Sequence, residues 1–539
     1  MTLIPAHSTP SEAASAHWYL VGGGIAALAS AVYLLRDGQV PGRNIHLLEQ
    51  AQMGGSLDAS GSAAEGYSMR GSRMFGPAYV LTYDLLAQIP SLDDPEKSVT
   101  EDTFDFWQST PWYARARLIE NGKALDLHAS GLSNRCRLEL IKLMLQDESV
   151  LGARPIEACF SADFFKSNFW LMWSTMFGFE TWHSAAELRR YFLRFLLLFE
   201  DLATLQIIQS TRYNGYDAIV RPLLRWLSAR GVDLQTGVQV SDLHFSPCAG
   251  GKAVSRLDCL RNGRAETIEL APGDRVIVTL GSMTADSSLG SMNSAPAAPP
   301  ARASAGGAWA LWRRLAEQDT AFGRPEAFCA HIDQTQWITF TVTHSDEHFF
   351  QQMQSFSGSS AGCGGLVTLK DSNWLVTLHL YHPPAYAETA GQGGAAYVWW
   401  GYGMYPDRVG NHVQKKMSDC SGAEILTEVF THLGLARDIP ALLASANCIP
   451  CLLPYTTSQF MPRAPGDRPA VLPAGSVNLA FVGQYCEIPD DVVYTVEYSV
   501  HSAKLAVAGL LGVDPALPPT YKGLDHPNAF MSALKVILK

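Results

Sequence analysis

Residues 17–38 read HWYLVGGGIAALASAVYLLRDG, an apolar strand-like run, three glycines and a helix-length apolar segment that ends at a glycine. Residues 44–49, NIHLLE, form a second strand-like run that ends in an acid. A strand, a glycine-rich turn, a helix and a second strand make the unit that opens a doubly wound α/β sheet. We therefore predict an α/β fold with a Rossmann-like sheet.

The turn carries the fingerprint of a dinucleotide site, Gly22-x-Gly24-x-x-Ala27. Gly22 permits the tight turn, Gly24 lets the backbone approach a pyrophosphate, and Ala27 allows close packing of the helix on the sheet. Glu49 lies 25 residues beyond Gly24 and is placed to accept hydrogen bonds from a ribose diol. A purely structural glycine turn is the alternative, but the strand–helix–strand context favours a nucleotide.

Two later features favour FAD over NAD, both by analogy with the fold. Gly54-Gly55-Ser56 directly follows the acidic strand end, and NLAFVGQ at 478–484 precedes a helix-like run. FAD proteins commonly bring backbone or a second helix N-terminus near the cofactor at these points. The predicted cofactor contacts therefore also include Gly55, Ser56, Gly483 and Val238, the last in the strand-like run 231–245.

The rest of the chain suggests one sheet built from non-contiguous segments, with an inserted substrate lobe and a helical C-terminal region. The FAD-binding domain is assigned to 17–100, 231–282 and 451–510. The other predicted parts are a mainly helical substrate-binding insertion at 101–230, a flexible Pro-rich linker at 283–307, a substrate-binding domain at 308–450 and a helical tail at 511–539.

Composition excludes several classes of function. A net charge of −11 argues against a nucleic-acid partner, which needs clustered Lys and Arg. The ten cysteines are scattered, so no metal site is predicted. The N-terminus has no secretory pattern and no apolar window is long enough to span a bilayer, so we expect a cytoplasmic protein. The amphipathic segment 528–539 suits transient contact with a membrane surface or packing on the body equally well.

Seven blocks of sequence resemble, in order, the oleate hydratases, also called the myosin-cross-reactive antigen family. They include VGGGIAALASAVYLLRDG at 21–38, GYSMRGSRMFGPAYVLTYDLLAQIPSL at 66–92, WHSAAELRRYFLRF at 182–195 and TRYNGYDAIVRPL at 211–223. The others lie at 399–426, 454–469 and 478–503. The resemblance implies an FAD-binding enzyme that adds water across the cis double bond of a long-chain unsaturated fatty acid, typically oleate to 10-hydroxystearate, with FAD in a non-redox role.

The resemblance also assigns the catalytic groups. Tyr191 aligns with the family's catalytic tyrosine, and a phenol is protonated at neutral pH and can donate a proton in a dry site. The family motif RGGRE, whose glutamate activates water, is here Arg70-Gly71-Ser72-Arg73-Met74, so a methionine stands in the glutamate's place. The resemblance places Arg70, Gly71, Ser72 and Arg73 against the cofactor, and the Ser72 hydroxyl is one group that could hold the water.

Two further motifs depart from the family pattern. Gly215 stands where the motif YNQY has glutamine, and the carboxylate-anchoring pattern is matched only loosely by TLHLYHPP at 377–384. There His379, Tyr381 and His382 could donate hydrogen bonds to a substrate carboxylate. We expect a divergent hydratase that retains activity, because general-base assistance is worth only roughly 10²–10⁴-fold.

Alternatives of other classes remain open from the sequence. One is an FAD-dependent oxidoreductase, amine-oxidase-like or fatty-acid-modifying, since redox use of FAD is commoner. Another is a non-catalytic FAD-dependent lipid-binding protein, which the missing glutamate makes conceivable. The sequence is compatible with a monomer or a homodimer.

Overall fold

The computed structural model describes residues 16–127, 130–390 and 396–538, and the N-terminal segment judged above for a secretory signal lies mostly outside them. Its centre is a five-stranded parallel sheet in the order β18-β11-β1-β2-β7. The strands are β1 (Trp18–Val21), β2 (Ile45–Leu48), β7 (Asp233–Gln235), β11 (Arg275–Thr279) and β18 (Leu479–Val482). The sheet therefore assembles from three distant parts of the chain.

Two apolar helices cover this sheet, α2 (Ile25–Arg36) and α17 (Val496–Leu511), and they pack against each other. In α2, every residue from Ile25 to Leu34 is buried, which is why its sequence is apolar all round. The helix α10 (Arg221–Ser228) packs on α2, and α3 (Val80–Leu86) packs on α17. α4 (Val99–Ser109) follows α3 and begins with a capping box on Ser98.

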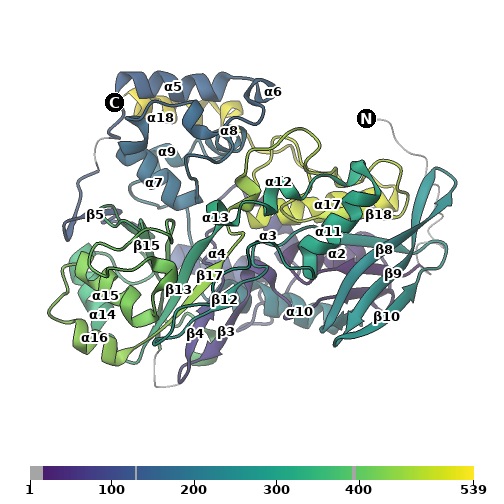
Figure 1. Cartoon of the computed structure of the whole chain (residues 1–539), viewed down its shortest axis with the longest axis horizontal. Helices are drawn as coiled ribbons and strands as arrows, with labels where there is room; N and C mark the ends of the chain where they lie inside the picture. Colours follow the sequence, from purple (N-terminus) through teal and green to yellow (C-terminus); the bar gives the residue numbers. More distant parts are fainter. Residues whose placement is uncertain (1–15, 128–129, 391–395, 539) are drawn as a thin grey trace.

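A three-stranded antiparallel sheet projects at the right of Figure 1. It contains β8 (Val238–Cys248), β9 (Gly251–Arg261) and β10 (Arg264–Glu269), with α11 (Gly307–Gln318) packed on β8. The run 231–245, expected to return to the first sheet, thus divides: β7 joins the parallel sheet, and β8 leaves it.

The largest sheet has eight strands in the order β12-β17-β13-β16-β15-β14-β5-β6. These are β5 (Leu118–Glu120), β6 (Lys123–Ala124), β12 (Ser288–Leu289), β13 (Trp337–His344), β14 (Leu366–Leu369), β15 (Val376–Leu380), β16 (Tyr397–Gly403) and β17 (Ala446–Leu453). The segment 283–307, expected as a flexible linker, supplies β12, which pairs with β17. The predicted helical insertion likewise supplies β5 and β6. The domain boundaries themselves stay predictions.

Helices cover one face of the eight-stranded sheet, and a hairpin contacts its middle. The covering helices are α14 (His348–Ser357), α15 (Gly422–His432) and α16 (Ile439–Ser445). The hairpin of β3 (Ala59–Ser62) and β4 (Gly66–Met69) packs on β13, where Tyr67 N–H and Met69 N–H donate to the hydroxyls of Thr343 and Thr341. Short helices α12 (Glu326–Cys329) and α13 (Ile332–Thr335) precede β13.

A helical lobe lies at the top of Figure 1. It contains α5 (Asn134–Leu145), α6 (Glu148–Leu151), α7 (Asn168–Phe177), α8 (Ala185–Arg194), α9 (Leu198–Asp201) and the C-terminal α18 (Pro527–Leu538). The predicted amphipathic tail is α18, which packs on α9 and buries Ala529, Ala533 and Ile537. Among the described residues, no helix combines the length and apolar character needed to cross a bilayer.

Candidate functional site

The first strand and helix of the parallel sheet meet at a turn with no room for side chains. Gly22 has φ +107°, and a Cβ there would lie 2.9 Å from Thr279 Oγ1. Gly24 begins α2 without a side-chain cap, so the first N–H groups of the helix are left for another acceptor. The second glycine turn touches the first, because a Cβ on Gly55 would lie 3.1 Å from Gly24 Cα. This is the cradle that a pyrophosphate needs.

The predicted acid lies at the same end of the sheet. Glu49 accepts hydrogen bonds from Gly23 N–H at 2.6 Å and Ala51 N–H at 2.9 Å, and its carbonyl accepts from Val238 N–H at 2.9 Å. Ala27 is buried where α2 meets the sheet, and Ser56 is half-buried in the turn after Gly55.

The third strand end joins this group. Gly483 follows β18 with φ +96°, and a Cβ there would lie 3.2 Å from Thr279 Cγ2. Thr279 ends β11, and its buried Oγ1 has no hydrogen-bond partner among the described residues. An orphaned hydroxyl between Gly22 and Gly483 fits a bound polar group at the carboxyl ends of the strands. The residues of the cradle therefore fit a dinucleotide such as FAD.

A cavity of about 100 Å³ lies between the helical lobe, the eight-stranded sheet, the loop after β4 and the start of α17. Its wall holds all three predicted catalytic residues, Ser72, Met74 and Tyr191. The remaining wall is mostly aromatic and aliphatic and includes Tyr79, Phe177, Phe195, Trp337, Trp400, Tyr402 and Tyr494. No aspartate, glutamate or histidine lines it among the described residues.

Tyr191 lies on α8 and is the most enclosed group of the wall. It is 1 % exposed, and its ring is surrounded edge-on by Phe177, Phe179 and Phe460. Its hydroxyl donates a hydrogen bond to the carbonyl of Val493. Burial raises the pKa of Tyr191 well above its usual value, so the phenol keeps its proton throughout the neutral range.

The loop after β4 brings the arginine–serine motif to the cavity. Arg70 pairs with Asp58 at 3.7 Å and donates to Ser287 Oγ at 2.9 Å. Arg73 lies with its guanidinium carbon 5.4 Å from the centre of the Tyr494 ring, and it forms no ion pair with a described carboxylate. A second cavity of about 10 Å³ is lined by Arg70, Gly71 and Arg73, and it shares Arg73 and Tyr494 with the first.

The predicted carboxylate-anchoring residues do not line either of these cavities. The His379 ring lies between Ser210 Oγ at 3.2 Å and the Gly365 carbonyl at 3.3 Å, and burial lowers its pKa to about 4. Burial raises the pKa of Tyr381 to about 12, against the opposing effects of the neighbouring Ser72 hydroxyl and Arg73 charge. His382 is exposed, edge-on to Phe106. Tyr381 is therefore adjacent to Ser72 and Arg73 of the cavity wall, and His379 pairs in the sheet with two other wall residues, Leu366 and Trp400.

Gly215 packs against Leu57 of the 54–58 turn. A Cβ there would lie 3.0 Å from Leu57 Cδ2, so a longer side chain at this position would point toward the turn that carries Gly55 and Ser56. The structure thus groups Gly215 with the candidate cofactor residues more closely than with Tyr191.

Sequence reasoning missed two pairs of cavity-wall residues and one residue of the cradle. Tyr79 lies in a matched block, five positions after Met74, and Tyr494 lies in another, but neither was distinguished from core. Trp337 and Trp400 come from neighbouring strands of the eight-stranded sheet and have no local signal. Thr279 ends the run DRVIVT, where a polar residue after three apolar ones would have marked a strand end facing a ligand.

The chain matches the MCRA family over residues 15–508. The protein belongs to the MCRA family. This MCRA-family chain is 38% identical to an oleate hydratase of Streptococcus pyogenes serotype M49 (strain NZ131), over 93% of this chain and 86% of that protein. It is 30% identical to a linoleate hydratase of Lactiplantibacillus plantarum, over 92% of this chain and 93% of that protein. The family resemblance seen in the motifs is confirmed.

Solved structures share the fold of this MCRA-family chain at low identity. Cyclohexylamine oxidase from Brevibacterium oxydans IH-35A superposes with a TM-score of 0.54 at 10% identity, covering 92% of this chain and 98% of the oxidase. A putrescine oxidase bound to putrescine gives 0.52 at 12% identity, covering 92% and 99%. These likenesses concern the fold, and they confirm the predicted α/β class with a Rossmann-like sheet.

Proposed function

We propose that this MCRA-family protein is a fatty-acid hydratase that adds water across the cis double bond of long-chain unsaturated fatty acids, oleate to 10-hydroxystearate being the expected case. One observation carries the proposal beyond the names of its relatives: a neutral, buried phenol, Tyr191, in a cavity wall that is mostly aromatic and aliphatic. An apolar cavity suits an acyl chain, and a phenol supplies the proton that an olefin lacks.

Tyr191 acts as the proton donor in this proposal. Its proton goes to one olefinic carbon, the water oxygen bonds to the other carbon, and the proton that water loses returns to the phenolate. In the structure the Val493 carbonyl accepts the hydroxyl hydrogen, so that carbonyl fixes where the hydroxyl lies before substrate arrives. Substrate must then compete with this hydrogen bond for the proton.

Water is held without a carboxylate in this proposal. Met74 lines the cavity where the family motif has glutamate, and a thioether does not accept a proton at physiological pH. The Ser72 hydroxyl, on the same wall, can accept and donate a hydrogen bond and is the residue we assign to hold the water. Losing the general base predicts a slower enzyme, by roughly 10²–10⁴-fold.

We propose FAD as the cofactor, held by Gly22, Gly24, Gly55 and Glu49 at the carboxyl ends of the parallel strands and by the Arg70–Arg73 loop. Hydration transfers no net electrons, so bound FAD would supply a polar edge and hold that loop in place without a redox cycle. Val238, Ser56, Ala27 and Gly483 complete the predicted contacts. The assignment rests on the glycine cradle and on the orphaned Thr279 hydroxyl.

The fatty acid must reshape the cavity when it binds. A cavity of about 100 Å³ is smaller than the ~300–1,000 Å³ typical of ligand sites. An 18-carbon chain therefore requires wall side chains to move apart. The carboxylate anchor stays a prediction: Tyr381 and His379 are both adjacent to wall residues, and His382 is the exposed candidate.

The test is incubation of the purified protein with oleate and FAD, followed by mass spectrometry of the lipid. A product heavier than oleate by one water supports the hydratase. Bleaching of the flavin by the lipid would instead indicate a redox flavoenzyme, and tight oleate binding with no mass change would indicate a lipid-binding protein. Either of those results contradicts the proposal.

A further inference from the structure

The helix that carries Tyr191 presents a charged face to the rest of the molecule. Glu187, Arg190, Tyr191 and Arg194 are spaced three or four residues apart on α8, so they share one side of the helix. All four are buried. Charged side chains are seldom buried without partners, so this face must meet complementary groups.

Glu187 meets arginines from a segment far along the chain. Its Oε1 accepts from Arg468 at 2.8 Å and from Arg463 Nε at 3.2 Å. Burial opposes ionisation of Glu187, but Arg468, Arg463 and Arg190 outweigh it and lower its pKa to about 2. The helical lobe is thereby bound to the segment between β17 and β18.

Arg190 binds the segment that follows β18, which we call the 487–495 loop. Its guanidinium pairs with Glu487 at 2.9 Å and donates to the carbonyls of Ile488 at 3.3 Å and Asp491 at 3.2 Å. The guanidinium also forms a bidentate ion pair with Glu148 of α6, in which Nε lies 2.8 Å from Oε2 and Nη2 lies 2.7 Å from Oε1. One buried side chain therefore links the helical lobe to three positions of the loop.

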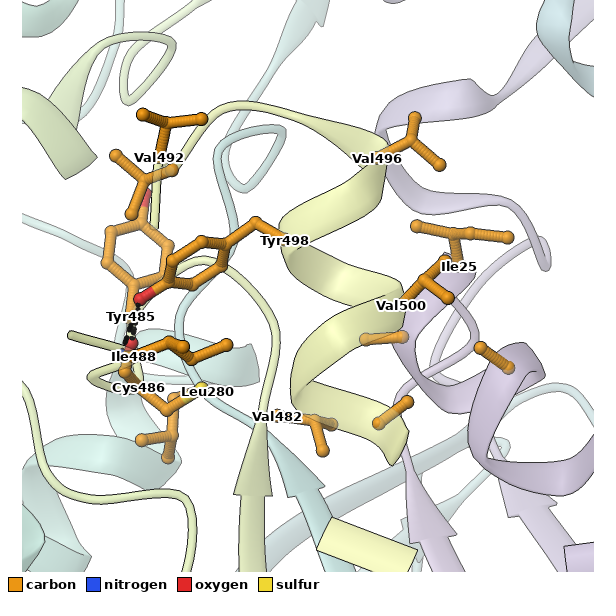
Figure 2. Packing of buried hydrophobic residues seen from close by; sticks show 14 of the residues in the cluster. Ile25, Leu280, Val482, Tyr485, Cys486, Ile488, Val492, Val496, Tyr498 and Val500 are labelled. Atoms are coloured by element: carbon orange, nitrogen blue, oxygen red, sulfur yellow. Dashed lines mark hydrogen bonds between the residues drawn. The ribbon is translucent and has the colours of Figure 1, made fainter. Parts of the chain in front are cut away.

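The 487–495 loop is also fixed to α17, which belongs to the parallel-sheet body. Figure 2 shows Tyr498 of α17 inserted under the loop, where its hydroxyl donates to the Cys486 carbonyl and accepts from Ile488 N–H. His501, one turn further along α17, pairs with Asp491 at 2.7 Å. The loop is thus attached to the body, whereas Tyr191 belongs to the lobe.

The Tyr191 hydroxyl and its Val493 acceptor therefore come from different parts of the molecule. Figure 1 places α8 in the upper helical lobe and α17 beside the parallel sheet. Tyr494, Thr495 and Val496, which directly follow Val493, form part of the cavity wall. A shift of the lobe relative to the loop would move the proton donor relative to that wall.

We propose that Arg190 is a positioning residue, which sets the placement of the Tyr191 hydroxyl in the cavity by fastening α8 to the 487–495 loop. Arginine suits this role because its planar fork donates to several acceptors in fixed directions. The inference rests on the proposed hydratase function. A misplacement of about 1 Å is enough to cost roughly 10²-fold in rate.

The test compares Arg190→Gln with a matched control, Glu148→Gln. Arg190→Gln removes the contacts to Glu487, Ile488 and Asp491, whereas Glu148→Gln weakens the ion pair on the opposite side of Arg190 and leaves the loop contacts in place. We expect Arg190→Gln to lower kcat for oleate hydration roughly 10²-fold with KM within about threefold. Glu148→Gln should keep kcat within about threefold of the parent.

Hydrogen exchange of peptides covering 487–495 gives a readout that does not depend on turnover. Exchange there should rise in Arg190→Gln and stay at the parent level in Glu148→Gln. If Arg190→Gln does not fold, Arg190→Lys keeps the buried positive charge without the fork and should show the same changes in smaller size.

The outcomes separate the two proposals. A parent protein that makes no hydroxy acid overturns the hydratase, and unchanged loop exchange in the Arg190 variant independently overturns the fastening role. If the parent is active, an Arg190 variant with parental kcat overturns the positioning role. An equal loss of kcat in Glu148→Gln also overturns it, because both variants would then report only a general loss of stability.

Discussion

Tyr191 combines two properties that rarely occur together: a dry aromatic surround and a hydroxyl aimed at a defined acceptor. Its sequence block identified the residue, but nothing in the block pointed to Val493, which is 302 positions away. The resemblance could name the tyrosine because motifs are local. It could not supply the contact that holds the phenol, because that contact joins two remote segments.

Tyr191→Phe tests the proton donor. We expect a loss of kcat of roughly 10²–10⁴-fold, the range of general acid catalysis, with FAD binding retained. The Val493 carbonyl loses its donor, so the free energy of unfolding should also fall by about 1–3 kcal/mol. Turnover of oleate and denaturant unfolding measure the two effects.

The control for that variant is Tyr213→Phe. Tyr213 is also buried and donates to Asp93 at 2.6 Å, but it does not line the cavity. Its loss should lower stability and leave kcat within a few-fold of the parent. Equal losses of kcat in both variants would remove Tyr191 from the proton-transfer step.

Met74 offers the complementary test on the water side. Met74→Glu restores a carboxylate in the cavity wall, and if water activation limits the rate, kcat should rise by up to about 10²-fold. Met74→Gln has a similar size and polarity but no proton acceptor of useful basicity, so it should leave kcat near the parental value. A glutamate variant no faster than the glutamine variant would show that water activation is not limiting.

At the scale of elements, the unit with a local sequence pattern was predicted, whereas short strands that pair with distant parts of the chain were not. The unit 17–49 was predicted correctly because β1, the glycine turn, α2 and β2 follow one another in the chain, and the glycines separate apolar runs of strand length and helix length. The two-residue strand β12 was not foreseen, because small and proline-rich sequence has no strand period and its partner β17 lies about 160 residues away. β5 likewise pairs with the distant β14.

At the start of α8, the buried residue His183 makes the stability of the fold depend on pH. His183 is fully buried: Nδ1 accepts from Glu180 N–H at 2.9 Å, so Nε2 carries the hydrogen and donates to Thr457 Oγ1 at 3.2 Å. Burial lowers the pKa of His183 to about 3. In the unfolded chain this histidine has a pKa near 6.5 and binds a proton below that pH. In the folded chain it stays neutral until the pH approaches 3.

This difference predicts an acid-dependent loss of stability. The contribution is fully present above about pH 6.5 and is lost as pH falls from 6.5 toward 3, amounting to about 2 kcal/mol between pH 7 and pH 5. His183→Gln removes the titrating group. Between pH 7 and pH 5, the free energy of unfolding of this variant should therefore fall by about 2 kcal/mol less than that of the parent. Denaturant titrations at pH 8, 7, 6 and 5 measure the difference. If the free energies of unfolding of the parent and of His183→Gln fall equally with pH, His183 is not the source of the acid-dependent loss.

At the scale of the whole molecule, the cofactor cradle and the cavity are both assembled from remote segments. The cradle joins Gly22 and Gly24 to Thr279 and Gly483, and the cavity joins the 70–79 loop to α8, the eight-stranded sheet and the 494–496 segment. The glycines were predictable because a fingerprint has fixed spacing. The aromatic wall was not, because composition does not separate a lined cavity from core.

This assembly predicts that FAD stabilises the entire fold. At a concentration 100-fold above its Kd, FAD should add about 2.7 kcal/mol to the free energy of unfolding and raise Tm, because only the folded chain brings the cradle together. Glu49→Gln keeps one acceptor oxygen for the N–H of Gly23 or Ala51, places an amide NH2 opposite the other, and loses the negative charge that a ribose diol favours. Since hydrogen bonds to charged groups contribute about 1.5–3 kcal/mol, the variant should bind FAD roughly tenfold or more weakly and show a smaller rise in Tm at the same concentration.

FMN, which lacks the adenosine half, should give little rise in Tm with either protein. If FMN stabilises the parent as much as FAD, or if Glu49→Gln responds to FAD like the parent, the nucleotide does not occupy the cradle between Gly22 and Glu49.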